Sequence, residues 1–454
     1  LIEKFQGQMD AFNDALESRK LQKFDRLLST GQSPIIELDY SDYQEGDCQV
    51  CHYRPVDVDV SDQYQHRHGT QVKLCWECSE QIEHIGRLLP HCRHLVFNKA
   101  DSGGIGLFGD TRLDLVDQVD RSKHKNSLEI VSIRKRGRFA YQPIATHLPM
   151  ISNEDINLWR TLGELNTSTD GQLWIGDERI AEGDTKTFNL MARSAREITA
   201  DKKPVGRSFL GAFKADVDNL GMLFSIGLQD RLSISRFASL SRMLNHFFSD
   251  DLVEWIRTDF PDLYVVFAGG DDLFLLGPWR QIVGFSKALN DRFRLFVADR
   301  PLITLSAGIA VTKPALPVNT IAAQVESQLE AAKHHPGKNA VNLFCTTVNW
   351  DDFAKLLEKG DWLHALIRDG LVPRGLGARL LYYGKERQAF NAGDIKRGIY
   401  LSHMQYDFAR NITERSVKDA QQRAQIMAIQ QDKMMLDQVT LPVSWALYRL
   451  RKDA

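Results

Sequence analysis

The sequence lacks an excess of charge of either sign, a long apolar run and a recognisable export signal. Its 454 residues contain 57 Lys and Arg against 59 Asp and Glu, and this balance gives no evidence for or against a nucleic-acid partner. Apolar runs such as residues 273–276 are far shorter than the roughly 18 residues that mark a membrane span. The charged N-terminal segment has no apolar core followed by a cleavage site, so we predict a cytoplasmic protein without a membrane partner.

The chain is longer than one ordinary domain. At roughly 150 residues per domain, its length suggests about three domains. The residue patterns divide it into a helical connector (1–45), a mixed module (46–203), an α+β domain (204–348) and a helical domain (349–454). The first residue is Leu1 rather than Met, and the opening helical pattern has no start signal, so we expect a piece of a longer protein.

The first two regions have weak periodicity after an initial helix. Apolar residues at helical spacing predict an amphipathic helix over residues 1–30. Short strand-like runs at 128–133 and 139–144, together with a glycine-rich stretch at 103–109, indicate a small α+β or β-rich module. The segment 121–138 is locally basic, as are Lys202, Lys203 and Arg207, and both solvated faces and phosphate contacts are consistent with that.

The pattern becomes regular after Pro204. The order is strand, helix, hairpin, helix, strand and a further helix, which is the βαββαβ pattern of a ferredoxin-like palm, so the predicted fold class is α+β. Beyond Trp350 nearly every segment has a helical pattern. The predicted palm elements are strand 209–217, helix 234–248, hairpin strands 263–268 and 273–277, helix 281–297, strand 302–311 and helix 321–333.

Aspartates lie at the ends of two predicted palm strands. Asp216 and Asp218 end the first strand, and Asp271 and Asp272 lie in the hairpin turn after Gly269 and Gly270. In a ferredoxin-like sheet the first strand neighbours this hairpin, so the two sets should meet and hold Mg²⁺ or Mn²⁺ for nucleotidyl transfer. The GGDD turn alone is also typical of a solvated hairpin, because Gly and Asp favour turns. The prediction of a metal site therefore rests on the combination of the GGDD turn with the DxDN sequence at 216–219, one helix earlier.

Two lysines follow the last predicted palm strand. Lys333 ends a helix and Lys338 belongs to a GKN sequence at 337–339. A lysine at a helix C-terminus often only complements the helix dipole. Beside a triphosphate, both lysines would act as point charges on the phosphates, and the aspartates favour this second interpretation.

Four of the six cysteines form two CxxC pairs. Cys48 and Cys51, followed by Cys75 and Cys78, have the paired spacing of a tetrahedral zinc site. His52, His66 and His68 lie between the pairs as substitute ligands. A site whose ligands all come from the protein braces the fold rather than catalysing, so we predict structural Zn²⁺. Cys92 and Cys345 are expected to be buried small hydrophobic residues.

Taken together, these motifs resemble the large signature subunit of type III CRISPR interference complexes, in the version found in type III-A (Csm) complexes. The resemblance extends over nearly the whole chain, and the combination of motifs is more specific than GGDD alone. The matching segments are the CxxC pairs, KADVDNLG (214–221), FAGGDDLFLLGPW (267–279), LSAGIAV (305–311), AAKHHPGKNAV (331–341) and the helical tail.

The resemblance implies a palm that converts ATP into cyclic oligoadenylate when the complex binds target RNA through its guide RNA. It implies that Asp271 and Asp272 hold the metals with Asp216, and that the tail docks on other Csm subunits. The predicted catalytic residues are Asp216, Asp271 and Asp272. The predicted nucleotide-binding residues are Gly269, Gly270, Asn219, Lys333 and Lys338.

Two departures and two alternatives accompany this resemblance. The family's HD nuclease domain and first palm are not found in this sequence, and because its nucleotides bind between two palms, this chain alone is expected to hold ATP without making product. A diguanylate cyclase is the nearest enzymatic alternative, although Asp272 and Leu273 replace its Glu and Phe. A scaffold subunit with a silent palm is the non-enzymatic alternative.

Overall fold

The computed structural model is of the mixed α+β class. It describes residues 11–12, 14–20, 22, 29, 43–52, 54–68, 71–89, 92–99, 104–106, 110–120, 122–125, 127–133, 139–141, 146–222 and 234–451. Most of the predicted N-terminal helix and the basic residues 134–138 lie outside these ranges. Within them, no helix is both long enough and apolar enough to cross a bilayer.

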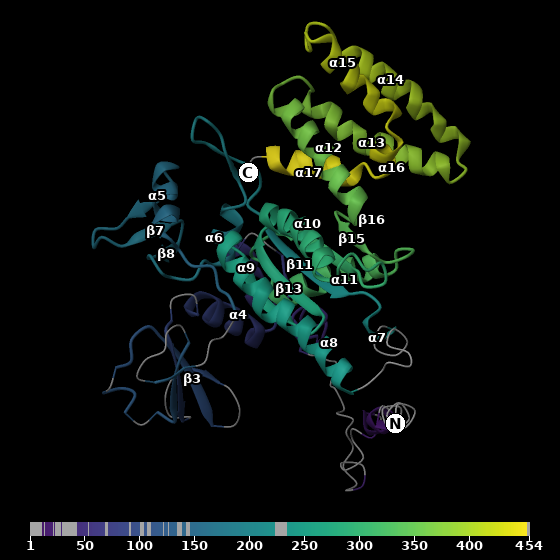
Figure 1. Cartoon of the computed structure of the whole chain (residues 1–454). Coiled ribbons are helices and arrows are strands. Elements are labelled where there is room, and N and C mark those ends of the chain that lie inside the picture. Colours follow the sequence, from purple (N-terminus) through teal and green to yellow (C-terminus); the bar gives the residue numbers. More distant parts are fainter. Residues whose placement is uncertain are drawn as a thin grey trace.

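A six-stranded sheet forms the centre of the molecule (Figure 1). Its strand order is β12-β13-β11-β14-β15-β16, and β11 is antiparallel to both β13 and β14. The predicted βαββαβ order is therefore confirmed, with boundaries displaced by up to three residues. The strands are β11 (Leu210–Val217), β12 (Tyr264–Gly269), β13 (Asp272–Pro278), β14 (Leu305–Thr312), β15 (Ala340–Leu343) and β16 (Thr346–Asn349).

The hairpin of β15 and β16 was missed by the sequence prediction, which placed no strand after residue 311. Each of its strands has only four residues. Its turn uses Phe344 (φ 52°) and Cys345 (φ 58°), neither of which is the Gly or Asn that usually signals such a turn. Cys345 is exposed at this turn, which contradicts the prediction that it is buried, whereas Cys92 is buried as predicted.

An aromatic core covers one face of the sheet. Side chains alternate along β11, so Phe213, Ala215 and Val217 point into this core. Phe213 packs edge-on against Phe285 of helix α10. The covering helices are α8 (Ile234–His246), a π-helical turn (Phe247–Asp251), α9 (Leu252–Asp259) and α10 (Trp279–Phe296), seen in front of the sheet in Figure 1.

The opposite face of the sheet carries helix α11 (Val318–Lys333) and the short helix α6 (Phe188–Arg193). Helix α11 packs on β14 at Gly308, where a Cβ atom would lie 2.3 Å from the Leu329 nitrogen and 2.7 Å from the Val325 oxygen. A side chain there would push the helix off the sheet, so Gly308 allows the close approach. Ala212, Lys214 and Asp216 of β11 belong to this second face.

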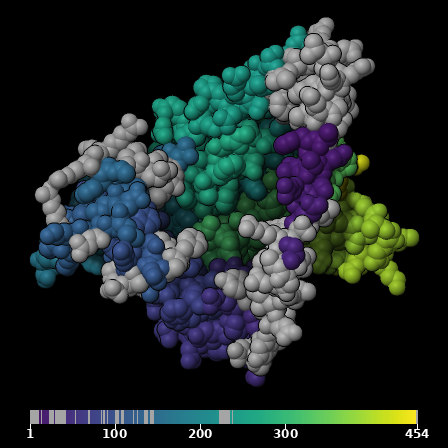
Figure 2. Space-filling view, turned by 90° about the horizontal axis from the view of Figure 1, so that it is seen from below, coloured from purple at the N-terminus to yellow at the C-terminus, as the bar shows by residue number. Residues whose placement is uncertain are grey.

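The N-terminal half contains smaller units. Cys48 and Cys51 precede helix α3, Cys75 immediately precedes helix α4, and Cys78 lies in the first turn of α4. In Figure 2 this indigo part of the chain lies next to green residues. The other elements form a five-stranded sheet in the order β2-β3-β1-β4-β5, a three-stranded sheet β6-β7-β8, and a two-stranded sheet β9-β10. Their bounds are α3 (Val58–His68), α4 (Trp76–Leu88), β1 (His94–Lys99), β2 (Ile105–Gly106), β3 (Thr111–Val116), β4 (Glu129–Ser132), β5 (Ala140–Tyr141), α5 (Asn153–Thr161), β6 (Asn166–Thr167), β7 (Leu173–Ile175), β8 (Glu178–Ile180), β9 (Glu197–Ile198) and β10 (Pro204–Val205).

The chain beyond Trp350 is helical up to residue 451, as the sequence predicts. These helices surround a separate core that includes Leu380, Tyr400, Phe408 and Leu436. The elements are α12 (Trp350–Arg368), α13 (Arg374–Asn391), a 3-10 turn (Ile395–Ile399), α14 (Tyr400–Asn411), α15 (Ala420–Met427), a second 3-10 turn (Ala428–Gln431), α16 (Lys433–Asp437) and α17 (Thr440–Leu450).

Two glycine substitutions test the packing of α11 on the sheet. Gly308→Ala should destabilise the protein by about 1–3 kcal/mol, because the added methyl overlaps the backbone of α11. Gly284→Ala in α10 is the matched control, since nothing lies within 4 Å of its added Cβ, and it should stabilise by about 0.5–1 kcal/mol. Urea unfolding measures both. Equal midpoints for the two variants would show that the close approach is not there.

Candidate functional site

The three predicted catalytic carboxylates come together at one edge of the sheet. Asp216 is the register partner of Asp272 on β13 and of Ser306 on β14. Asp271 precedes Asp272 in the turn, and its carbonyl oxygen accepts a hydrogen bond from the Val217 N–H at 3.0 Å. The strand pairing predicted from the sequence therefore brings the DxD and GGDD segments side by side.

The local electrostatics favour a cation at this edge. Burial raises the pKa of Asp216, and the charges of Asp271 and Asp272 raise it further, against the opposing effect of Lys333. Burial also raises the pKa of Asp272, with contributions from Asp271 and Glu326. Asp272 Oδ1 is buried and has no hydrogen-bond partner in the part of the chain that the structure describes. A divalent cation with oxygen ligands fits an unpaired carboxylate oxygen in such a cluster.

Asp218 has a different environment from Asp216. It is buried, and its carboxylate accepts hydrogen bonds from the hydroxyls of Thr304 and Ser306 at 2.8 Å each. It also accepts one from the Asn339 N–H at 3.1 Å. Asp218 thus joins β11, β14 and the loop containing residues 337–339, and its oxygens are already satisfied.

The two predicted phosphate-binding lysines differ in their contacts. Lys333, at the end of α11, lies with its Nζ 3.1 Å from Asp216 Oδ2 and 3.7 Å from Glu330 Oε1. Lys338 has φ 54°, its N–H donates to the His335 carbonyl at 2.8 Å, and its ammonium forms no ion pair with any described residue. Lys333 is therefore at the carboxylates, and Lys338 lies in the loop that Asp218 anchors.

Sequence reasoning missed a second charged pair beside this cluster. Lys214, two residues before Asp216 on the same face of β11, is paired with Glu326 of α11. The charge of Lys214 lowers the pKa of Asp272, although burial outweighs it. Because side chains alternate along a strand, Lys214 is expected on the same face of β11 as Asp216, two residues later. No local sequence pattern indicates its partner Glu326, which lies on a helix 112 residues later.

The GGDD turn requires its second glycine. Gly270 has φ +66°, a backbone conformation that favours glycine. Its N–H donates to Oδ1 of Asn245, an α8 residue that the sequence did not single out, at 3.2 Å. Asn219 has φ 60°, and its side-chain amide donates to the Leu302 carbonyl at 3.5 Å, so it is engaged with the loop before β14.

The four cysteines of the CxxC pairs also converge. Their sulfur atoms all lie within 4.8 Å of one another, and no disulfide joins them. Cys51 Sγ and Cys75 Sγ are 3.9 Å apart, close to the ~3.8 Å that zinc–sulfur bonds of ~2.3 Å give in a tetrahedron. Neither His52 nor His66 belongs to the cluster, and His52 instead lies 3.4 Å from Asp47. The predicted four-cysteine grouping is confirmed.

The thiols of this cluster influence one another. Burial raises the pKa of Cys75 to about 11, and burial with the neighbouring sulfurs raises that of Cys78 further. Burial also acts on Cys48, but hydrogen bonds from the backbone of Cys51, Cys75 and Val50 outweigh it and lower its pKa. The donor set of four closely spaced sulfur atoms fits a soft divalent cation.

The cysteine module contacts the start of α11, the helix that ends at Lys333. The Asn319 side-chain amide donates to the carbonyl of Val50, which lies inside the first CxxC, at 2.6 Å. The Tyr64 hydroxyl donates to the Ala315 carbonyl at 2.5 Å, and Leu316 packs against the same module. The cysteine cluster thus supports one end of the helix whose other end reaches the carboxylates.

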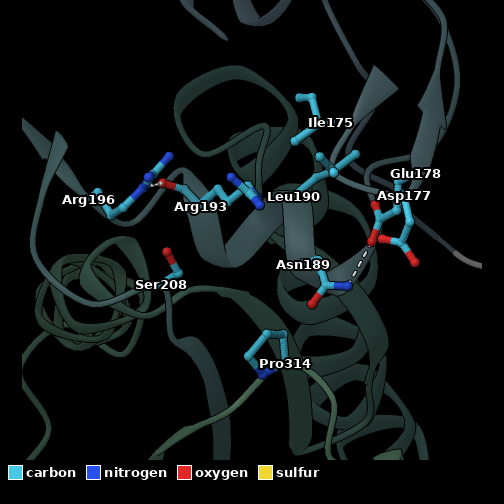
Figure 3. Close-up of a pocket in the computed structure, with 10 residues that line it drawn as sticks. Ile175, Asp177, Glu178, Asn189, Leu190, Arg193, Arg196, Ser208 and Pro314 are labelled. Atoms are coloured by element: carbon cyan, nitrogen blue, oxygen red, sulfur yellow. Dashed lines mark hydrogen bonds between the residues drawn. The ribbon is translucent and has the colours of Figure 1, made fainter. Parts of the chain in front are cut away.

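A pocket of about 340 Å³ lies elsewhere, between the β7–β8 hairpin, α6 and the far end of the central sheet (Figure 3). Three of its charged groups already have partners: Glu178 accepts from Asn189 at 2.7 Å, and Arg193 and Arg196 are paired with Glu164 at 3.4 and 2.6 Å. Ser208 and Pro314 line it, and they flank the ends of β11 and β14 opposite to Asp216. This pocket is therefore separate from the carboxylate site.

Comparison with known proteins finds a family match for the part of the chain that forms most of the six-stranded sheet. The family model for the second palm domain of Cas10/Cmr2 matches residues 209–342. A Methanocaldococcus jannaschii protein, the CRISPR system single-strand-specific deoxyribonuclease Cas10/Csm1 (subtype III-A), is 32% identical over 206 residues, covering 40% of this chain and 25% of that protein. The Mycobacterium tuberculosis protein of the same name is 34% identical over 178 residues, covering 35% and 22%.

A solved structure is also similar to this chain, at low sequence identity. The Csm1–Csm4 cassette in complex with one ATP gives a TM-score of 0.46 at 19% identity, over 83% of this chain and 50% of that chain. The sequence matches cover about a quarter of the length of the curated relatives. From the family match and these relatives, the chain belongs to the Cas10/Csm1 family of subtype III-A CRISPR systems.

Proposed function

We propose that this chain carries a metal-dependent nucleotidyltransferase site that makes cyclic oligoadenylate from ATP. The observation that carries the proposal is the pairing of Asp216 with Asp272 across adjacent strands, with Asp271 beside them. The match of residues 209–342 to the second palm domain of Cas10/Cmr2 supports it. On this proposal the six-stranded sheet is a ferredoxin-like palm of the nucleotidyl cyclase type.

Asp216, Asp271 and Asp272 would hold Mg²⁺ or Mn²⁺. When bound, the metal would neutralise triphosphate charge and lower the pKa of the attacking hydroxyl. The fit rests on the unpaired buried Oδ1 of Asp272 and on the raised pKa values of Asp216 and Asp272, because a cation relieves the mutual repulsion of these carboxylates. A mononuclear and a two-metal site are both compatible with three carboxylates.

The remaining predicted residues would bind and orient ATP. Gly269 and Gly270 leave the turn without side chains, which permits a phosphate to approach the backbone. Lys333 and Lys338 would place positive charge on the phosphates, and the present contact of Lys333 with Asp216 keeps its ammonium at the site. Asn219 would act from the end of β11, where its left-handed conformation turns the chain.

The biological setting follows from the family and is also proposed. In a type III-A complex, guide RNA would bind target RNA and thereby activate this palm, with other Csm subunits as partners. Each nucleotidyl transfer joins the hydroxyl of one nucleotide to the α-phosphate of an ATP and releases pyrophosphate as the α–β phosphoanhydride bond breaks, so we propose that a second palm supplies the other nucleotide. Residues 1–45, 46–203, 204–348 and 349–454 would be the connector, zinc-binding linker, palm and helical docking domain of this subunit.

Structural Zn²⁺ would be held by Cys48, Cys51, Cys75 and Cys78. All four sulfurs come from the protein, so no position is left open for a substrate. Through Val50 and Asn319, the zinc module would support α11 and hence the position of Lys333. Its role would be to brace the fold at a distance from the reaction.

The assembled complex tests the catalytic proposal. With magnesium, cognate target RNA and radiolabelled ATP, the wild-type complex should form cyclic product, and Asp271→Ala/Asp272→Ala should reduce its rate by at least about 100-fold, because the metal ligands are lost. A parallel reaction with radiolabelled GTP tests the diguanylate-cyclase alternative, which predicts that GTP is the preferred substrate. A preference for GTP, or an unchanged rate in the double variant, contradicts the proposal.

The carboxylate cluster should cost stability when no metal is bound. Because the folded-state pKa of Asp272 is raised, ionisation there opposes folding, and this cost is present above the folded pKa and is relieved as the pH falls through it. Asp272→Asn should therefore raise the Tm at pH 7 in EDTA, while losing the increase in Tm that Mn²⁺ gives the wild type. Differential scanning calorimetry at pH 7 and pH 5 measures both. A lower Tm for Asp272→Asn in EDTA would contradict the assigned strain.

Elemental analysis tests the zinc assignment. The purified protein should contain about one zinc ion per chain, and Cys48→Ser/Cys78→Ser should lose it and unfold at a lower temperature, because metal binding contributes to folding. Cys92→Ser is the control, since Cys92 is also buried but lies outside the cluster. Retention of stoichiometric zinc by the double variant would show that other ligands bind it.

A further inference from the structure

The GGDD turn is held from outside its own hairpin, by helix α8. The Gly270 N–H donates to Asn245 Oδ1 at 3.2 Å. The Ser249 hydroxyl lies 3.2 Å from the same Oδ1 and 3.5 Å from the Ala268 carbonyl, so it can donate to either acceptor. A Cβ built on Gly269 would be 3.4 Å from Ser249 Oγ and 3.6 Å from Asn245 Oδ1, which shows that these two side chains lie over the first glycine.

The opposite side of the turn is fixed by strand β11. The Val217 N–H donates to the Asp271 carbonyl at 3.0 Å, and Asp272 is in register with Asp216. The Asp271 carboxylate itself accepts no hydrogen bond and forms no ion pair among the described residues. The position of this carboxylate therefore depends on the backbone of the turn, which is hydrogen-bonded to Val217 on one side and to Asn245 on the other.

Buried neighbours support Asn245 and Ser249, the two polar residues that contact the GGDD turn. Asn245 is in the last turn of α8, and Ser249 is in the π-helical turn Phe247–Asp251 that follows. Phe247 and Phe248 of that turn are buried, and Phe247 stacks on Phe296 with ring centroids 4.5 Å apart. Single π-turns inside helices are frequent at functional sites, because the extra residue redirects side chains. Here it leaves two aromatic rings in the core and two polar groups at the GGDD turn.

We propose that Asn245 is a positioning residue for the metal-binding turn, with Ser249 orienting its amide. This inference rests on the proposed function of the three aspartates. By fixing the Gly270 N–H, Asn245 restricts a glycine that otherwise samples many conformations, and so places Asp271 before the metal arrives. Its loss should weaken metal binding and slow the reaction, while the KM for ATP changes little.

The test uses the assembled complex with target RNA and Mn²⁺ as the metal. Asn245→Ala should raise the Mn²⁺ concentration for half-saturation roughly three- to tenfold, the range expected for one net hydrogen bond, and lower kcat with KM for ATP nearly unchanged. Asn245→Asp keeps an acceptor oxygen and should restore most of kcat. Ser249→Ala should act in the same direction as Asn245→Ala, but should add nothing in the Asn245→Ala background, because it acts through Asn245.

The control is Asn153→Ala, which removes an exposed asparagine whose amide donates to Glu182 at 2.5 Å in the N-terminal half. It should match the wild type. Mn²⁺ binding is also followed by electron paramagnetic resonance, which needs no turnover. An Asn245→Ala complex that keeps the wild-type metal dependence overturns this inference alone, even if its Tm is lower. A wild-type complex that neither binds Mn²⁺ nor makes product overturns the proposed function and this inference together.

Discussion

The site depends on the register of one strand. In β11, Asp216 lies between Asp272 on β13 and Ser306 on β14, and Phe213, Ala215 and Val217 alternate with it into the aromatic core. Because side chains on a strand have a period of two, a slip by one residue would bury Asp216 in that core. The burial of β11's apolar side chains therefore fixes the position of its carboxylate as well.

The same arrangement holds Asp216 and Asp272 together, and these carboxylates oppose folding when no cation is bound. Burial raises the pKa of Asp216 and of Asp272, the neighbouring carboxylate charges add to this effect, and Lys333 and Lys214 compensate only in part. Such local strain persists because the surrounding packing is over-determined, here by α11 lying close on Gly308 and by Phe247 of the π-helical turn, which stacks on Phe296 of α10. The unpaired Oδ1 of Asp272 is kept in place by this support.

The regions outside the sheet attach to the helices that flank it. The cysteine module bonds to the first turn of α11 through Asn319. At the start of α10, Arg280 lies 3.1 Å from Glu197 of β9, which also binds Arg449 of α17 at 2.6 Å. His364 of α12 joins this cluster, where burial and the neighbouring arginines lower its pKa to about 4, so it stays neutral near pH 7. Side chains from β9, α10, α12 and α17 thus meet at one partly buried ionic cluster.

The sequence by itself determined the βαββαβ order, the meeting of Asp216 with the GGDD turn, the four-cysteine grouping and the helical tail. These features follow from local periodicity, from short motifs, and from the rule that the first strand of such a sheet neighbours the hairpin. Only the tertiary structure decided which other polar residues lie beside the site. These are Asn245 on α8, which contacts the GGDD turn, and the Lys214–Glu326 ion pair. The tertiary structure also separated Asp216 from the fully hydrogen-bonded Asp218, although both stand in one DxD motif. Such contacts join residues far apart in the chain through packing, and no local pattern records which side chains packing brings together.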